Sequence, residues 1–116
     1  MTEEELSLED VIKICSKVRL DNGSLTFDSY GTGEVRISTT EFLYSIGKTL
    51  EDAEEVINNL KVSDYFRGPT DHHDQNKRVH KLWEFKKIAF NMIIYIKIIP
   101  YNKNRYIAVV SFHEDR

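Results

Sequence analysis

The spacing of apolar residues changes once along this 116-residue chain, and that change restricts the fold more than any other feature. Within residues 7–19 and 39–60, apolar side chains recur every three or four positions, which is the period of a helix with one buried face. From residue 79 onward they alternate with polar side chains, as in strands that bury one face. Helices followed by strands predict an α+β fold, with N-terminal helices packed on one face of an antiparallel sheet.

Three helices are expected in the first half, over residues 7–19, 39–47 and 50–60. Ser7 and Thr49 each precede an acidic residue by three positions, which is the capping pattern that opens a helix. Gly47 is expected to end the second helix because glycine readily adopts a positive φ. Residues 24–37 are expected to form irregular structure or a weak hairpin, with extended candidates at residues 25–27 and 34–37.

Three strands are expected in the second half, over residues 79–86, 93–99 and 105–113. Gly68-Pro69 is expected to stop the regular structure before them, and residues 70–78 form a polar loop.

Strand alternation predicts which side chains share a face. If Trp83 and Phe85 face the helices, and Ile94, Ile96 and Ile98 do the same, one assignment gathers Glu84, Tyr95, Lys97 and His113 on the solvent side. For the last strand, this assignment buries Tyr106, Ala108, Val110 and Phe112. It also leaves Ile93, Ile99, Ile107 and Val109 on the solvent side, so it indicates either a second apolar contact or one wrong parity.

Length and composition predict one domain, residues 1–116, because a chain this short can bury only one core. No apolar run approaches the roughly 18 residues needed to cross a bilayer, and the N-terminus is acidic. These features favour a cytoplasmic protein. Its single cysteine, Cys15, lies among the apolar positions of the first expected helix and is interpreted as a small buried hydrophobic residue.

The net charge of −3 conceals an asymmetry between the two halves. Residues 1–59 carry thirteen acidic and five basic side chains, whereas residues 60–105 carry four acidic and ten basic ones. A polyanion such as RNA is attracted by the local field, because charges farther than about 10 Å away are screened by salt. On charge alone, an ordinary solvated lysine surface explains the second half equally well.

Four segments of the second half resemble toxins of the motility quorum-sensing regulator (MqsR) family, in their order and approximate spacing. They are Val62–Pro69, Leu82–Phe85, Ile94–Ile98 and Val109–His113. The resemblance implies a RelE-like α+β fold, metal-independent cleavage of mRNA, no cofactor, and neutralisation by a cognate antitoxin protein. It covers roughly the last half of the chain, and the first half matches only in outline.

The resemblance also implies a catalytic set of Arg67, Glu84, Tyr95 and His113. Only Tyr95 is unchanged from the family pattern, in which Arg67 and His113 are lysines and Glu84 is a glutamine. RNA contacts are expected at basic side chains of the same half, namely Lys77, Arg78, His80, Lys86 and Lys97.

Chemistry supports this set in outline. Attack by the 2′-hydroxyl needs a base, an acid at the departing 5′-oxygen, and cations around the phosphorane. A histidine suits either proton transfer, and Glu84 is a candidate base or a support for the imidazole. Arg67 and Lys97 are candidates for phosphate charge, and Tyr95 for orienting phosphate or stacking on a base.

Beside the nuclease hypothesis, the sequence raises a non-catalytic function and a metal site, and it leaves two possible roles for Trp83. The altered positions favour a non-catalytic module that keeps the toxin fold and binds RNA or protein. The run Asp71-His72-His73-Asp74 contains metal-ligand types, but neighbouring residues rarely converge on one ion, so a solvated loop is the preferred interpretation and no metal site is expected. Trp83 is interpreted as a core residue in preference to a base-stacking platform.

Overall fold

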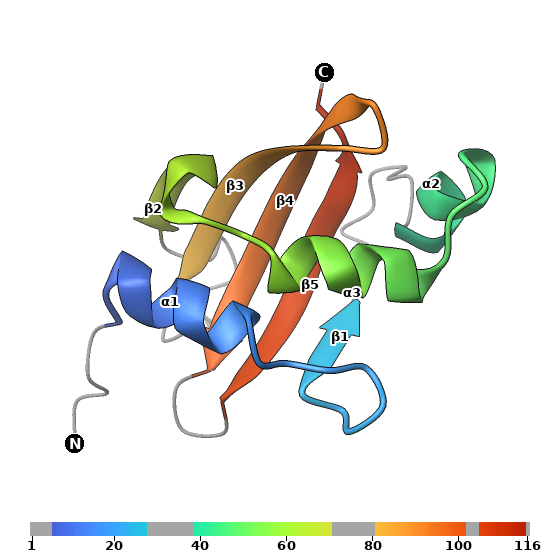
Figure 1. Cartoon of the computed structure of the whole chain (residues 1–116). Coiled ribbons are helices and arrows are strands. Elements are labelled where there is room, and N and C mark those ends of the chain that lie inside the picture. Colours follow the sequence, from blue (N-terminus) through green and yellow to red (C-terminus); the bar gives the residue numbers. More distant parts are fainter. Residues whose placement is uncertain (1–5, 28–38, 71–80, 102–104, 116) are drawn as a thin grey trace, which may run out of the picture.

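The computed structural model describes residues 6–27, 39–70, 81–101 and 105–115, which form three α-helices and a five-stranded mixed sheet (Figure 1). The elements in chain order are α1 (Leu8–Cys15), β1 (Leu25–Phe27), α2 (Thr39–Ser45), α3 (Leu50–Asn58), the 3₁₀ turn η1 (Val62–Asp64), β2 (Tyr65–Thr70), β3 (Leu82–Ala89), β4 (Met92–Tyr101) and β5 (Tyr106–Glu114). The α+β class is therefore as predicted, with helices before the three long strands. None of the helices in the described segments is long and apolar enough to span a membrane.

Both predicted capping patterns are present. The Asp10 backbone N–H donates to Ser7 Oγ at 3.1 Å, and the Ser7 N–H donates to the Asp10 carboxylate at 3.0 Å. Thr49 makes the same reciprocal bonds with Asp52 at the start of α3. Such caps satisfy N–H groups that have no partner inside the helix.

The ends of the first two helices differ in how well they were predicted. Gly47 has φ +71° just after α2, as expected for a residue that ends a helix. The first helix ends at Cys15, four residues earlier than predicted. Asn58 of α3 donates to the carbonyls of Cys15 and Val18 at 2.8 and 3.0 Å, so a side chain from another helix satisfies carbonyls at and beyond the end of α1.

The sheet has the strand order β1-β5-β4-β3-β2. Its centre, β3-β4-β5, is the antiparallel arrangement expected from the sequence. One edge corrects the prediction: β1 pairs with β5 in parallel, with Leu25 opposite Ile107, so the sheet is mixed. Residues 25–27 thus pair with the last strand, while residues 34–37 of the expected hairpin lie outside the described segments.

The other edge strand, β2, also corrects the prediction, because its pairing with β3 continues past Gly68-Pro69 to Thr70, with a register shift on each side of Arg67. Proline is tolerated on an edge, where its missing N–H interrupts no second ladder. Gly68 has φ +121°, and a Cβ there would lie 2.6 Å from the Leu82 carbonyl oxygen. The backbones of β2 and β3 can approach this closely only at glycine.

A β-bulge in β5 corrects the predicted parity of that strand. Lys97 lies opposite Ser111, but the next residue, Ile98, lies opposite Val109, so Val110 is an extra residue. Ile107 and Val109 consequently pack in the core with Phe112, whereas Ala108 and Val110 lie on the other side. The predicted face was correct for Ser111, Phe112 and His113. It was wrong for the residues of β5 before the bulge, because an inserted residue reverses the alternation.

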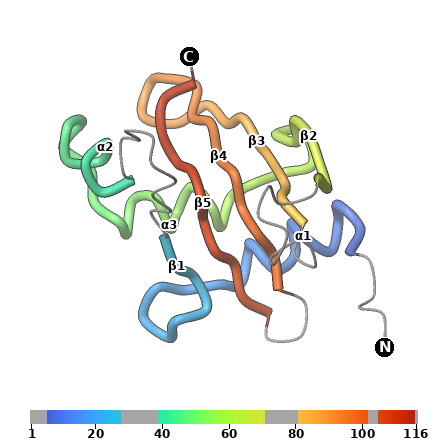
Figure 2. Tube along the Cα trace, turned by 180° about the vertical axis from the view of Figure 1, so that it is seen from behind, coloured from blue at the N-terminus to red at the C-terminus, as the bar shows by residue number. Residues whose placement is uncertain are grey.

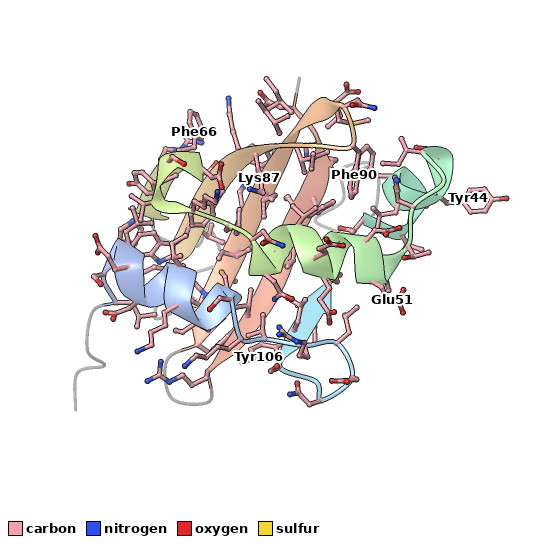
Figure 3. All side chains as sticks on the ribbon, viewed as in Figure 1. Tyr44, Glu51, Phe66, Lys87, Phe90 and Tyr106 are labelled. Carbon is pink, nitrogen blue, oxygen red and sulfur yellow. The ribbon has the colours of Figure 1, made fainter. Side chains whose placement is uncertain are left out.

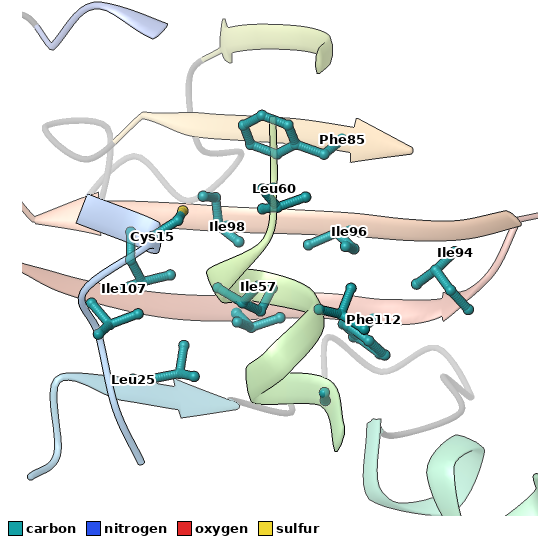
Figure 4. Packing of buried hydrophobic residues seen from close by; sticks show 14 of the residues in the cluster. Cys15, Leu25, Ile57, Leu60, Phe85, Ile94, Ile96, Ile98, Ile107 and Phe112 are labelled. Carbon is teal, nitrogen blue, oxygen red and sulfur yellow. The ribbon is translucent and has the colours of Figure 1, made fainter. Parts of the chain in front are cut away.

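The main core lies between the helices and one face of the sheet, and Figure 4 shows its close packing. Ile94, Ile96 and Ile98 of β4 are fully buried there, as predicted. Trp83 is 5% exposed and belongs to this core, in agreement with its interpretation as a packing residue. Ile57 from α3 and Cys15 from α1 pack against the same strands.

The opposite face of the sheet, hereafter the distal face, points away from the three helices (Figure 2). It carries side chains of the three long strands, which alternate along each strand except at the Val110 bulge: Leu82, Glu84, Lys86 and Ile88 of β3; Ile93, Tyr95, Lys97 and Ile99 of β4; and Ala108, Val110, Ser111 and His113 of β5. Leu82, Ile99 and Ala108 form a small second apolar cluster on it.

Candidate functional site

Strand register places the candidate residues in two adjacent rows across the distal face. Residues directly opposite each other in an antiparallel pair point to the same side. One row contains Glu84, Lys97 and Ser111, and Arg67 of β2 extends it beyond Glu84. The next row contains Lys86, Tyr95 and His113, and these two rows bring together all four residues of the predicted catalytic set.

Arg67 and Glu84 form a two-pronged ion pair. Arg67 Nε donates to Glu84 Oε2 at 2.7 Å, and Arg67 Nη2 donates to Glu84 Oε1 at 2.9 Å. The side chain of Glu84 is only 3% exposed, whereas that of Arg67 is 61% exposed. The pair therefore combines a buried carboxylate with a largely exposed arginine side chain, whose guanidinium can also meet an anion.

Tyr95 connects this ion pair to the histidine. Its hydroxyl donates to Glu84 Oε1, and its ring stacks on that of His113, with centroids 5.4 Å apart and planes 28° from parallel. Burial and the adjacent carboxylate raise the pKa of Tyr95, so the phenol keeps its proton. Because that proton is directed at Glu84, the outer lone pairs of the phenol oxygen are hydrogen-bond acceptors.

One ring nitrogen of the histidine is engaged by the backbone. His113 Nδ1 lies 2.9 Å from the Glu114 carbonyl oxygen, which can only accept a hydrogen bond. The Nδ1 atom therefore carries the proton in the neutral ring, and Nε2 is the basic nitrogen. This tautomer suits a group that takes a proton from a bound substrate.

Glu84 is held in its ionised form. Hydrogen bonds from Arg67, and a weaker one from Tyr95, lower its pKa against the opposing effect of burial, and the charge of Lys97 adds to this. The same contact raises the pKa of Arg67. Glu84 accordingly orients Arg67 and Tyr95, and does not support the imidazole as one interpretation of the sequence suggested.

Two further residues beside Lys86 were missed by the sequence analysis. Lys86 Nζ lies 4.1 Å from the centroid of the Phe66 ring and 3.2 Å from the Asp115 carboxylate. The guanidinium of Arg67 lies 5.4 Å from the centroid of the same ring, so the exposed ring of Phe66, labelled in Figure 3, contacts two cations. The position of Phe66 next to Arg67 in the sequence was the one signal for it. No sequence signal indicated the ion pair between Asp115 and Lys86, because it depends on the register of β5.

Several predictions fall outside what the structure describes. Lys77, Arg78 and His80 lie there, as does the run of aspartates and histidines at residues 71–74. Within the described segments, no group of three or more histidine, cysteine, aspartate or glutamate side chains is arranged to hold a metal ion. Cys15 is buried, as interpreted, and burial raises the pKa of its thiol to about 12.

The sequence and the structure were each compared with known proteins. No protein-family model, no curated protein and no solved structure matches the chain.

Proposed function

We propose that the chain is a metal-independent mRNA endoribonuclease, the toxin of a type II toxin–antitoxin pair, with a RelE-like fold of the MqsR kind. The observation that carries the proposal is the connected set of Arg67, Glu84, Tyr95 and His113 on one face of the sheet. These side chains come from four strands and from positions up to 46 residues apart, and together they supply a base, an oriented phenol and a cation.

Each group has a role in cleavage by the 2′-hydroxyl. His113 Nε2 takes the proton of the 2′-hydroxyl, whose oxygen then bonds to the adjacent phosphorus. The bond from phosphorus to the 5′-oxygen breaks, and water supplies the proton that the departing oxygen needs. The Arg67 guanidinium balances the charge that builds up on the phosphorane.

Tyr95 and Glu84 position these groups. Glu84 holds Arg67 by two bonds and fixes the Tyr95 hydroxyl, and the Tyr95 ring holds the imidazole by stacking. Arginine in place of the family's lysine keeps the positive charge. Glutamate in place of glutamine adds the negative charge that makes the two-pronged contact.

The proposal is tested by incubating the purified protein with single-stranded RNA in EDTA. The wild-type protein is expected to cut the RNA, and His113→Ala to remove cutting while leaving the circular dichroism spectrum unchanged. Glu114→Gln is the matched control, because it changes the neighbouring exposed residue and is expected to retain activity. Equal cutting by wild type and His113→Ala would remove His113 from the mechanism.

A cell-based test addresses the partner. Expression of the wild-type chain in bacteria is expected to arrest growth, and a small neighbouring gene is expected to encode the neutralising antitoxin. His113→Ala should relieve the arrest at equal protein level. An arrest that persists with this variant would contradict a catalytic cause of toxicity.

One observation favours the second candidate, a module that binds RNA or protein without cutting. The Arg67–Glu84 pair cancels one positive and one negative charge at the centre of the site. If the protein binds RNA without cutting it, the RNA would remain intact in the same assay but would migrate more slowly on a native gel. Loss of cutting specifically in EDTA would instead indicate a metal.

A further inference from the structure

The bulge at Val110 turns a second polar residue onto the distal face beside His113. Val109 faces the core, and strict alternation would bring Ser111 and His113 back into the core and turn Phe112 outward. The extra residue reverses this, so Ser111 and His113 both lie on the distal face while Phe112 is 1% exposed in the core. Bulges often lie next to active sites, where they redirect side chains in this way.

Ser111 lies directly opposite Lys97, which faces Glu84 on its other side. Cβ atoms of directly opposed residues are about 5 Å apart, so the serine hydroxyl and the lysine ammonium can meet one ligand. A hydroxyl donor beside an ammonium is a common combination for binding RNA or DNA phosphates, where serine and lysine both contribute contacts to the backbone. The serine adds a directed hydrogen bond to the lysine's less directional charge.

The spacing of the two rows matches a nucleic-acid backbone. Tyr95 and Lys97 are two residues apart on β4, so their rows are separated by about 7 Å. This is comparable to the spacing of successive phosphates in an extended single strand. A phosphate at the Tyr95 and His113 row therefore places its neighbour at the Lys97 and Ser111 row.

We infer that Ser111 and Lys97 form a second phosphate-binding subsite, which holds the phosphate next to the scissile one and aligns single-stranded RNA along β4 and β5. This inference rests on the proposed nuclease function and extends it. It assigns Ser111, which the sequence resemblance did not single out, to substrate binding. It also predicts that the enzyme distinguishes substrates by the presence of one particular neighbouring phosphate.

The test uses three short substrates built on the dinucleotide that spans a mapped cleavage position. The first has only the scissile phosphate, the second has an added 5′-terminal phosphate, and the third has an added 3′-terminal phosphate. For the wild-type protein, one of the two added phosphates is expected to raise kcat/KM about tenfold, the size expected for a hydrogen bond to a charged group. Ser111→Ala should remove most of that gain, measured as the ratio of kcat/KM with the added phosphate to kcat/KM without it.

Two control variants separate binding from folding. Ser111→Thr keeps the hydroxyl and should retain the gain. Ser16→Ala removes the hydroxyl of an exposed serine, bonded to the Lys13 carbonyl beside α1, and should change none of the three rates.

Each outcome decides between the two claims. If Ser111→Ala slows all three substrates equally, or if neither added phosphate helps the wild-type protein, the subsite is refuted while the nuclease function stands. If the wild-type protein cuts no RNA, the proposed function itself fails and the subsite falls with it.

Discussion

Replacing Tyr95 with phenylalanine removes one hydrogen bond to the buried Glu84 carboxylate and leaves the ring in place. A hydrogen bond to a charged group contributes about 1.5–3 kcal/mol to folding. Tyr95 is only partly buried, so we expect the lower end, about 1.5 kcal/mol at pH 7. For a domain of this size that loss lowers Tm by about 6 °C.

The effect should depend on pH in a defined direction. The pKa of Glu84 is lowered in the folded protein, so its ionised form adds stability above its unfolded pKa of about 4.3. That contribution is lost as the pH falls through the lowered folded pKa. The difference between wild type and Tyr95→Phe should therefore be largest above pH 5 and should shrink at more acidic pH.

Urea unfolding of both proteins, in steps from pH 7 to pH 2.5, measures this difference. Tyr44→Phe is the matched control, because Tyr44 is 86% exposed and points away from the rest of the molecule (Figure 3). It should match the wild type at every pH. A Tyr95→Phe protein that is as stable as the wild type, or that loses the same free energy at every pH, would refute the bond between Tyr95 and ionised Glu84.

Three substitutions and one labelling experiment test the rest of the fold. Phe112→Ala should lower the free energy of unfolding in urea by about 3–5 kcal/mol, because it opens a cavity under the three long strands. Thr49→Ala should lower the same quantity by about 1 kcal/mol through loss of the cap of α3, and unchanged stability would contradict that cap. Gly68→Ala should lower Tm and the RNA cleavage rate together, because its Cβ would displace β2, and Arg67 with it, from the Leu82 carbonyl. Cys15 should resist iodoacetamide at pH 8 until urea unfolds the chain, because burial raises the pKa of its thiol to about 12. Mass spectrometry measures the labelling, and rapid labelling of the folded protein would show that Cys15 is not buried.

Local signals predicted most of the helices and the central strands. The capping residues Ser7 and Thr49 bond to residues three positions away, so the sequence pattern that predicts each cap spans a single helical turn. The alternation in β3 and β4 likewise identified which side chains face the core. The sequence alone therefore places Glu84 and Tyr95 on one face of the sheet.

Features that depend on distant partners could not be predicted. The parallel pairing of β1 is determined by β5, about 80 residues later, and three residues carry too little pattern to indicate it. The bulge at Val110 cannot be recognised in the sequence, because residues 107–110 are all apolar and fit either parity of the strand. The bonds of Glu84 to Arg67 and Tyr95 depend on strand register, which the sequence does not specify where both faces are apolar.

The chemistry of the RNA ends tests the central claim most directly. RNA incubated with the protein in EDTA should yield fragments whose masses correspond to a 2′,3′-cyclic phosphate on one side of the cut and a 5′-hydroxyl on the other. That result follows from attack by the RNA's own 2′-hydroxyl at the site built by Arg67, Tyr95 and His113. Fragments with a 3′-hydroxyl and a 5′-phosphate, or RNA that stays intact, would contradict it.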